Sequence, residues 1–192
     1  NGGRNISPRS CAAKAFAQCA LLHFWRTSMS SLQIIQDHDK WRKGTGGAPA
    51  GLAGESDGNV YVGLDLGLIT FTSSTFNGSR FGSTSFMDAV WTACRFTGCS
   101  FSRCDMQRIR ISGCSFTGCT FAASQLRAST FNDCTFSHCN LISLNLDASH
   151  WSQVKLLDCR GQQVSAADLV GEQVDFTGSR FEDMQFTNAR IN

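Results

Sequence analysis

A large apolar residue returns at every fifth position of this sequence from Phe71 to Ile191. Of the 25 positions in this series, 22 carry such a residue, and 13 of the chain's 15 phenylalanines are among them. A period of five matches neither the α-helix, which repeats every 3.6 residues, nor the β-strand, whose side chains alternate every two. The chain must therefore bend once in every five residues, always toward the same axis, which describes a coil with short, flat sides.

A second series, two residues before the first, holds small side chains. Ser, Thr, Ala or Cys occupies 17 of its 25 positions, and the other three positions of each pentad are mostly polar or Gly. Each pentad therefore predicts one large and one small residue facing inward and three residues facing solvent. The predicted structural core contains Phe76, Phe81, Phe86, Trp91, Phe96, Phe101, Phe116, Phe121, Phe131, Phe136, Trp151, Phe176 and Phe181.

The cysteines of the small series indicate how many pentads complete one turn. At a period of fifteen they spread almost evenly, but at a period of twenty most of them fall into two columns. These columns are Cys94, Cys114 and Cys134, and Cys99, Cys119, Cys139 and Cys159. Four pentads per turn, stacked at the strand spacing of about 4.8 Å, predict about six turns and a rod roughly 30 Å long.

The stretch from Phe71 to Ile191 resembles the pentapeptide-repeat family, whose motif is a small residue, Asp or Asn, Leu or Phe, and two free positions. The segments CSFTG at 114–118 and CTFAA at 119–123 match its small and central sites, and CDMQR at 104–108 and CNLIS at 139–143 add the Asp or Asn. The resemblance implies an all-β solenoid, a right-handed quadrilateral β-helix, and the handedness comes from the resemblance alone. It specifies the fold and says little about function.

The first part of the chain lacks the five-residue period. We predict that residues 1–59 form a helical N-terminal cap plus a Gly-rich connector, and that residues 60–192 form the β-helix. Apolar spacing predicts two helices in the cap, Cys11 to Trp25 and Ser31 to Lys43, with Gly44 ending the second. The span 44–59, rich in Gly and Ala, is predicted to be a flexible connector.

The predicted cap has a physical purpose, because each end of a coil of strands exposes unpaired backbone groups that invite association. Ile34, His38 and Trp41 fall on one face of the second predicted helix and suit such a cover. At the other end the sequence is still in phase at Asn192. We therefore expect either a homodimer through the uncapped C-terminal turn or a natural protein that continues.

One stretch departs from the pattern. At Gly161, Ala166 and Gly171 the large site shrinks, while the small site enlarges nearby, for example at Val164 and Leu169. Volume has moved between layers, which a packed interior tolerates. We expect the coil to continue there with a locally altered cross-section, and two interpretations stay open: a dent used for binding, or drift within a tolerant repeat.

The cysteines and histidines predict no catalytic, cofactor or metal site. The cysteine spacing equals the repeat, whereas structural zinc prefers paired ligands separated by two to four residues. Small buried thiols filling a core explain the cysteines better, and many unpaired thiols suit a reducing compartment. We therefore expect a cytoplasmic protein, or one delivered into a host or target cell. No histidine lies in a known catalytic motif, so we expect no enzyme.

Charge and hydropathy limit the classes of partner that the sequence predicts. The formal net charge of +2 is too small to predict nucleic acid or membrane as partner, and no apolar run reaches the roughly 18 residues of a membrane span. A protein partner is therefore expected. The outward-facing cations supply the candidate interaction surface, which consists of Arg80, Arg95, Lys155, Arg160 and Arg180.

Three classes of function compete. The first is a non-catalytic protein-interaction scaffold, as an accessory or effector fragment of a bacterial secretion system. The second is a DNA mimic that binds gyrase, a type II topoisomerase, since Phe preceded by Cys resembles the quinolone-resistance members of the family; those members present a strongly acidic face, which this near-neutral rod lacks. The third is an enzyme on a solenoid scaffold, which no sequence feature supports. We expect the first.

Overall fold

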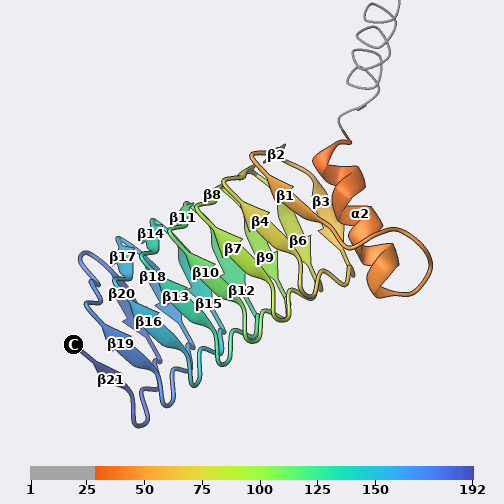
Figure 1. The fold of residues 1–192 in the computed structure, drawn as a ribbon. Helices are drawn as coiled ribbons and strands as arrows, with labels where there is room; N and C mark the ends of the chain where they lie inside the picture. The colour runs from red at the N-terminus through yellow and green to blue at the C-terminus, as the bar shows by residue number, and fades with distance from the viewer. Residues whose placement is uncertain (1–28) are drawn as a thin grey trace, which may run out of the picture. The chain divides into compact units, whose positions relative to one another are not determined.

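The five-residue period winds the chain into a coil of short parallel strands (Figure 1). The structure is a computed structural model that describes residues 29–192. The first predicted helix, Cys11 to Trp25, lies outside the described residues. Each strand is two or three residues long, and in the three-residue strands from β1 to β19 the central residue is buried while its neighbours face outward.

Strands one turn apart pair in parallel and form three ladders. Face A contains β1 (Gly51–Ala53), β4 (Thr70–Thr72), β7 (Val90–Thr92), β10 (Arg110–Ser112), β13 (Thr130–Asn132), β16 (His150–Ser152), β19 (Val170–Glu172) and β21 (Arg190–Ile191). Face B contains β2 (Ser56–Asp57), β5 (Thr75–Asn77), β8 (Arg95–Thr97), β11 (Ser115–Thr117), β14 (Thr135–Ser137) and β17 (Lys155–Leu157). Face C contains β3 (Val60–Val62), β6 (Arg80–Gly82), β9 (Ser100–Ser102), β12 (Thr120–Ala122), β15 (Asn140–Ile142), β18 (Arg160–Gln162) and β20 (Arg180–Glu182).

The fourth side is held by single parallel bridges rather than strands. It comprises Asp65, Ser85, Asp105, Gln125, Asn145, Ser165 and Gln185. Here Asx-type contacts tighten the turn: the Asp105 carboxylate, for example, accepts a hydrogen bond from the Gln107 N–H at 3.1 Å. Four sides per turn confirm the period of twenty that the cysteine columns predicted.

The coil has about seven turns rather than six, because it begins inside the predicted connector. Strands β1 and β2 lie within residues 44–59, which the sequence had suggested were flexible. Leu52 pairs with Phe71 and Asp57 with Phe76, each 19 residues apart, whereas Tyr61 pairs with Phe81 at 20. One residue is thus missing between Asp57 and Tyr61, and this slip in phase hid the first two strands from a search at a fixed period.

Each corner places one residue in the left-handed region of backbone space. On the edge that follows face B, for example, Gly78, Gly98 and Gly118 have φ of 69°, 59° and 61°. Gly adopts this conformation without steric cost, which explains the glycines at the outward positions. The corners also take other residues, such as Asp88 at 58° and Arg108 at 56°. This recurring corner supplies the bend in every pentad.

The core is one continuous column of stacked rings and aliphatic side chains. Phe96, Phe116 and Phe136 stack face to face at centroid distances of 4.8 and 4.6 Å, both with a 6° interplanar angle. Eleven of the residues predicted for the core are buried, and Phe176 and Phe181 are partly buried. The last turn is more open, with Phe186 45% and Ile191 37% exposed.

Helix α2 (Ser31–Arg42) packs against β1 and β2 at the N-terminal end of the coil (Figure 1). It ends one residue before the predicted end, and Gly44 adopts φ of 69° just after it. Ile35 and His38 are buried, while Ile34 is partly buried and Trp41 is 37% exposed. The helix therefore covers the first turn, with Ile35 rather than Trp41 as its main apolar anchor.

The coil continues through the stretch from Gly161 to Gly171, as the sequence predicted. A Cβ added to Gly161 would lie 2.1 Å from the Phe181 ring, and one added to Gly171 would lie 2.9 Å from Val174. Side chains of later positions therefore occupy the space that these glycines vacate. Val164, Ala166 and Leu169 are buried as well. The altered cross-section is therefore filled largely from within, and the hollow that remains beside Val164, Ala166 and Leu169 measures only about 10 Å³.

Candidate interaction surface

The five predicted interaction residues lie on two faces, all exposed. Arg80, Arg160 and Arg180 begin strands β6, β18 and β20 of face C, and Arg95 and Lys155 begin β8 and β17 of face B. Each points outward because the next residue is the inward one of its strand. The sequence period thus placed these side chains on the outer side of the wall, and a period of twenty divides them into the same two groups.

The strand register decides which of them are neighbours. Arg160 pairs directly with Arg180 on the adjacent strand. Arg80 stands apart, because three uncharged residues, Ser100, Thr120 and Asn140, separate it from Arg160 along the same row. On face B, two strands whose first residues are Ser115 and Thr135 separate Arg95 from Lys155. Of the predicted five, only Arg160 and Arg180 form an in-register pair.

Lys155 differs from this pair because it has an acidic neighbour. It forms a parallel bridge with Asp175, one turn later. Hydrogen bonds donated by the Thr177 hydroxyl and N–H, with a smaller contribution from the Lys155 charge, hold the pKa of Asp175 below its ordinary value. In the described residues, neither Arg160 nor Arg180 has a carboxylate within ion-pair distance.

Two surface hollows meet at the arginine pair. The first, of about 440 Å³, runs along face C between a row formed by Asn140, Arg160 and Arg180 and a row formed by Ile142, Gln162 and Glu182, with Gly161 between them. We call it the face C trough. The second, of about 500 Å³, lies at the corner beside it and is lined by His138, Asp158, Cys159, Arg160, Gly178 and Arg180.

Sequence reasoning named two of the residues that line the trough and missed most of the others. At a period of twenty, Asn140 falls in the same column as Arg80, Arg160 and Arg180, whereas Ile142, Gln162 and Glu182 were not among the predicted residues. Writing the outward positions in rows of twenty would have found them, since all belong to strands β15, β18 and β20. Gly161 contributes only backbone to the trough. A side chain at this position would point inward, toward Phe181, so its absence does not shape the trough.

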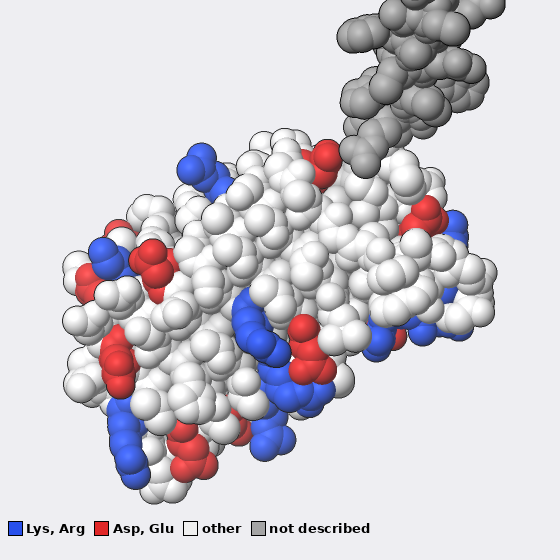
Figure 2. Space-filling model, viewed as in Figure 1, with Lys and Arg blue, Asp and Glu red and all other residues white. Residues whose placement is uncertain are grey.

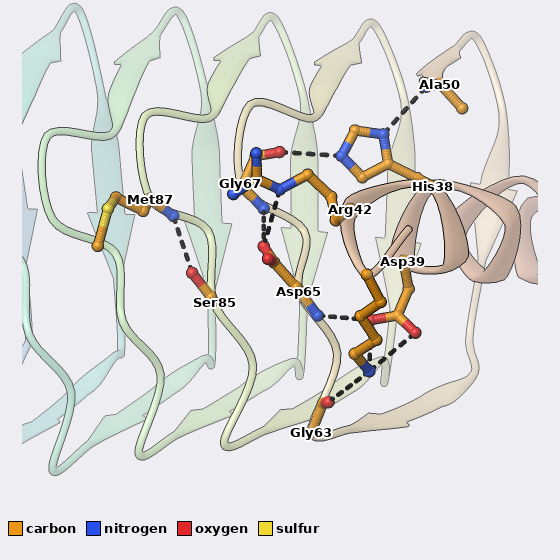
Figure 3. A network of polar contacts seen from close by, with 10 residues as sticks. His38, Asp39, Arg42, Ala50, Gly63, Asp65, Gly67, Ser85 and Met87 are labelled. Atoms are coloured by element: carbon orange, nitrogen blue, oxygen red, sulfur yellow. Dashed lines mark hydrogen bonds and ion pairs between the residues drawn. The ribbon is translucent and has the colours of Figure 1, made fainter. Parts of the chain in front are cut away.

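The densest polar cluster of the described residues lies elsewhere, where α2 meets the first turn (Figure 3). The Ala50 N–H donates to His38 Nδ1 at 3.0 Å, so Nε2 carries the proton and donates to the Gly67 carbonyl at 2.9 Å. Asp39 accepts from the Asp65 N–H at 2.6 Å and pairs with Lys43 at 2.8 Å. These groups satisfy one another, so the cluster serves to attach the helix.

A second polar cluster, beneath α2, was not predicted from the sequence. Asp57 is buried in the core column that Phe76 and Phe96 continue. Its carboxylate accepts hydrogen bonds from Tyr61 (2.6 Å), Ser31, Ser79 and the Asn59 side chain (2.7 Å each), and the Asn59 N–H (3.1 Å). Burial raises the pKa of this carboxyl, but the hydrogen bonds outweigh it and hold the pKa below its ordinary value. Asp57 therefore joins helix, first turn and second turn.

The cysteines stack in the predicted columns inside the wall. All eight cysteines among the described residues are buried and unpaired. Their thiols donate to backbone carbonyls, as Cys134 does to Ile111 O at 3.4 Å. Burial raises the pKa of the Cys104 thiol to about 11, whereas the hydrogen bond from Cys139 lowers that of Cys159 to about 7. Within residues 29–192 no group of His, Cys, Asp or Glu side chains is arranged to hold a metal ion.

Charges of both signs are dispersed over the coil. Figure 2 shows one side of the molecule, with acidic and basic side chains scattered between wide uncharged areas. Some opposite charges pair across turns, as Arg108 and Asp88 do through two contacts of 2.8 Å. In the described part of the chain no helix is long and apolar enough to cross a membrane.

Comparison with known proteins agrees with this architecture. Two family models match, "Pentapeptide repeats (8 copies)" over residues 79–118 and "Pentapeptide repeat region" over residues 109–186. No curated protein matches the chain.

Several solved structures are similar. QnrB1, a plasmid-mediated fluoroquinolone resistance protein, is 14% identical, with 71% of this chain and 93% of that chain covered and a TM-score of 0.36. Rfr23 from the cyanobacterium Cyanothece 51142 is 12% identical, with 54% and 64% covered and a TM-score of 0.31. HetL from the cyanobacterium Nostoc sp. strain PCC 7120 is 11% identical, with 84% and 96% covered and a TM-score of 0.24. We draw nothing about function from likenesses this distant. The repeat, the four-sided coil and the two family matches together show that the chain belongs to the pentapeptide-repeat family.

Proposed function

We propose that this protein is a non-catalytic scaffold that binds a partner protein through face C. The observation that carries the proposal is the in-register pair of Arg160 and Arg180, two exposed cations on adjacent strands with no carboxylate of the described residues at ion-pair distance. They stand beside the face C trough, which offers shape as well as charge.

The wall behind these side chains supports a binding role, because it is rigid. Backbone hydrogen bonds link each turn to the next around the arginine pair, for example from Arg160 N to Cys139 O and from Arg180 N to Cys159 O, both at 2.9 Å. A preorganised surface loses little conformational entropy when a partner binds, so more of the contact energy appears as affinity. A solenoid also offers an extended surface made of repeated units.

The interior supports a role without catalysis. Two hollows inside the described part of the coil measure about 10 and 20 Å³ and have apolar linings, the second including Phe121, Leu146 and Trp151. Neither can hold a substrate, since one water molecule already needs roughly 10–15 Å³. The polar clusters of the described residues, around Asp57 and His38, are internally satisfied.

The gyrase-binding alternative needs a free acidic face. The region that most resembles such a face is the fourth side together with the corner that follows it. This region contains Asp65, Asp88 and Asp147, among others. Asp65 pairs with Arg42 and Asp88 with Arg108, while Asp147 accepts hydrogen bonds from Ser165 and Ala167. These contacts occupy the carboxylates, so we favour the scaffold. A role in a secretion system stays a prediction.

Site-specific photo-crosslinking tests the proposal. A photoreactive amino acid replaces Gln162 in face C in one version and Ser112 in face A in another, and each is irradiated in the cells that make the protein. We expect one defined protein adduct from the Gln162 position and little from the Ser112 position. Equal adducts from both faces, or none from either, would contradict a binding face. A gyrase supercoiling assay tests the alternative, which predicts inhibition.

A further inference from the structure

The arginine pair is an exception in this molecule. In the strand and bridge pairs that link successive turns, a charged residue lies beside an uncharged residue or, for Lys155 and Asp175, beside the opposite charge. Among the paired positions of residues 29–192, only Arg160 and Arg180 bring two like charges together. Like charges directly opposite each other on neighbouring strands destabilise a sheet, so this one pair suggests an anion supplied from outside.

Guanidinium groups bind carboxylates through charge-assisted, often bidentate hydrogen bonds. A carboxylate held between Arg160 and Arg180 would remove their repulsion and satisfy both. The Asn140 amide, next along the same row, adds an uncharged donor. Glu182 on the opposite side of the trough and Asp158 at the corner limit the amount of negative charge that the site accepts. The surroundings thus suit one carboxylate better than a run of phosphates.

The trough adds an apolar contact at a defined distance. Ile142, 40% exposed, lies on β15, next to β18. Since neighbouring strands are about 4.8 Å apart, a carboxylate centred between β18 and β20 stands about 7 Å along the coil axis from β15. An extended peptide advances about 6.6–6.8 Å in two residues, and those two side chains point to the same face. An acidic residue over the arginines therefore places its neighbour two positions away over Asn140, from where a large apolar side chain reaches across the trough to Ile142 in the other row.

We propose that the face C trough binds an extended segment of a partner protein in which an acidic residue and a large apolar residue are two positions apart. The acidic side chain lies between Arg160 and Arg180, and the apolar side chain covers Ile142. The segment runs along the coil axis, across strands β15, β18 and β20. This inference rests on the proposed scaffold function and specifies the chemistry of its partner.

A fluorescein-labelled heptapeptide, Gly-Leu-Ser-Asp-Ser-Leu-Gly, is the probe, since its leucines on both sides of the Asp serve either chain direction. Binding to the full chain is followed by fluorescence anisotropy at low salt. We expect saturable binding that weakens at least about tenfold when Asn replaces the Asp, because a charge-assisted contact is lost. Moving the leucines one position outward should also weaken it, by several-fold.

Two charge-matched variants locate the site. The double variant Arg160→Gln, Arg180→Gln should bind the peptide about tenfold more weakly or worse, whereas Arg80→Gln, Arg95→Gln, which removes the same charge from isolated positions, should stay within about twofold of wild type. Without peptide, Arg180→Gln should not lower the melting temperature, because it removes a repulsion. Circular dichroism spectra of all variants check that the coil is intact.

Three outcomes would overturn the proposal: equal loss in both double variants, equal affinity for the Asp and Asn peptides, or no binding to the wild type. Tighter binding of a 20-base-pair DNA duplex than of the peptide would do so as well and would indicate a nucleic-acid face. The crosslinking experiment separates these failures from that of the scaffold itself: an adduct at Gln162 that persists in the Arg160→Gln, Arg180→Gln variant supports a scaffold that binds by other contacts.

Discussion

Removing one ring from the middle of the aromatic column should destabilise the whole coil. Phe116 is fully buried and stacks between Phe96 and Phe136 at 4.8 and 4.6 Å. Truncation of a buried Phe to Ala costs about 3–5 kcal/mol through lost transfer energy and the cavity that remains. The neighbouring turns are fixed by backbone hydrogen bonds and cannot collapse into the space, so we expect Phe116→Ala to lie near 4 kcal/mol.

Phe176 provides the matched comparison. It has the same inward position on the last turn, but it is only partly buried, and its one ring contact is an edge-on one with Phe181 at 5.7 Å. Partial burial of a large side chain contributes about 1–2 kcal/mol, so Phe176→Ala should cost less than half as much as Phe116→Ala. Both variants remove the same side chain, so a difference between them reports how deeply each ring is buried in the column.

Thermal unfolding of the full chain, followed by circular dichroism, gives the melting temperatures of both variants, and urea unfolding, followed by tryptophan fluorescence, gives their free energies of unfolding. For a chain of this size 1 kcal/mol corresponds to about 2–4 °C in melting temperature, so Phe116→Ala should melt about 8–16 °C below wild type and Phe176→Ala about 2–8 °C below. Phe116→Ala within about 2 °C of wild type, or equal losses for both variants, would refute a continuous, mutually supporting column.

Other predictions concern the cap and the thiols. Tyr61→Phe should lower the free energy of unfolding by about 1–3 kcal/mol in urea titrations, because it removes a hydrogen bond from a buried carboxylate; no change would mean that Asp57 is solvated. Since the folded-state pKa of Asp57 lies below the ordinary 3.8, its stabilisation is fully present above about pH 4 and is lost as the pH falls through the folded pKa. The difference in urea midpoint between wild type and Asp57→Asn should therefore be constant from pH 7 to about 4 and shrink below it; a difference that grows on acidification would contradict this sign. Eight of the ten cysteines are buried in the coil, so a thiol reagent should rapidly label no more than the remaining two, Cys11 and Cys19, in the native protein. Rapid labelling of all ten would contradict the packing.

The fold was largely predictable from the sequence, because each pentad repeats one large and one small inward side chain. The Phe residues at a period of five defined the inward positions. The Cys residues at a period of twenty defined the number of sides. What failed was the start of the coil. Asp57 occupies a position that holds Phe on later turns, and the residue missing before Tyr61 breaks the phase, so neither composition nor a fixed period reveals the first two strands.

The candidate site was predictable only in part. An outward-facing arginine can be read from the repeat, but whether it has a carboxylate beside it depends on rows that run across turns. Lys155 and Arg160 look alike in sequence, yet Asp175 lies one turn after Lys155 and Arg180 one turn after Arg160. The volume change at Gly161 left two interpretations open, a dent or drift within the repeat, and only the structure shows that the Phe181 ring fills that space from the following turn. Such compensation between turns cannot be seen pentad by pentad.

The register that stacks Arg160 on Arg180 supports every functional inference, and engineered disulfides test it directly. In a background with Cys11 and Cys19 replaced by Ser, the pair Arg160→Cys, Arg180→Cys lies on adjacent strands, at a Cα separation within the roughly 4.4–6.8 Å that a disulfide needs. A coil of three pentads per turn would instead put position 160 beside position 175. We predict that mild oxidation links 160 to 180 and leaves Arg160→Cys, Asp175→Cys unlinked, as peptide mapping by mass spectrometry would show. Efficient linkage of 160 to 175, with none to 180, would contradict the four-sided coil and the paired arginines on its surface.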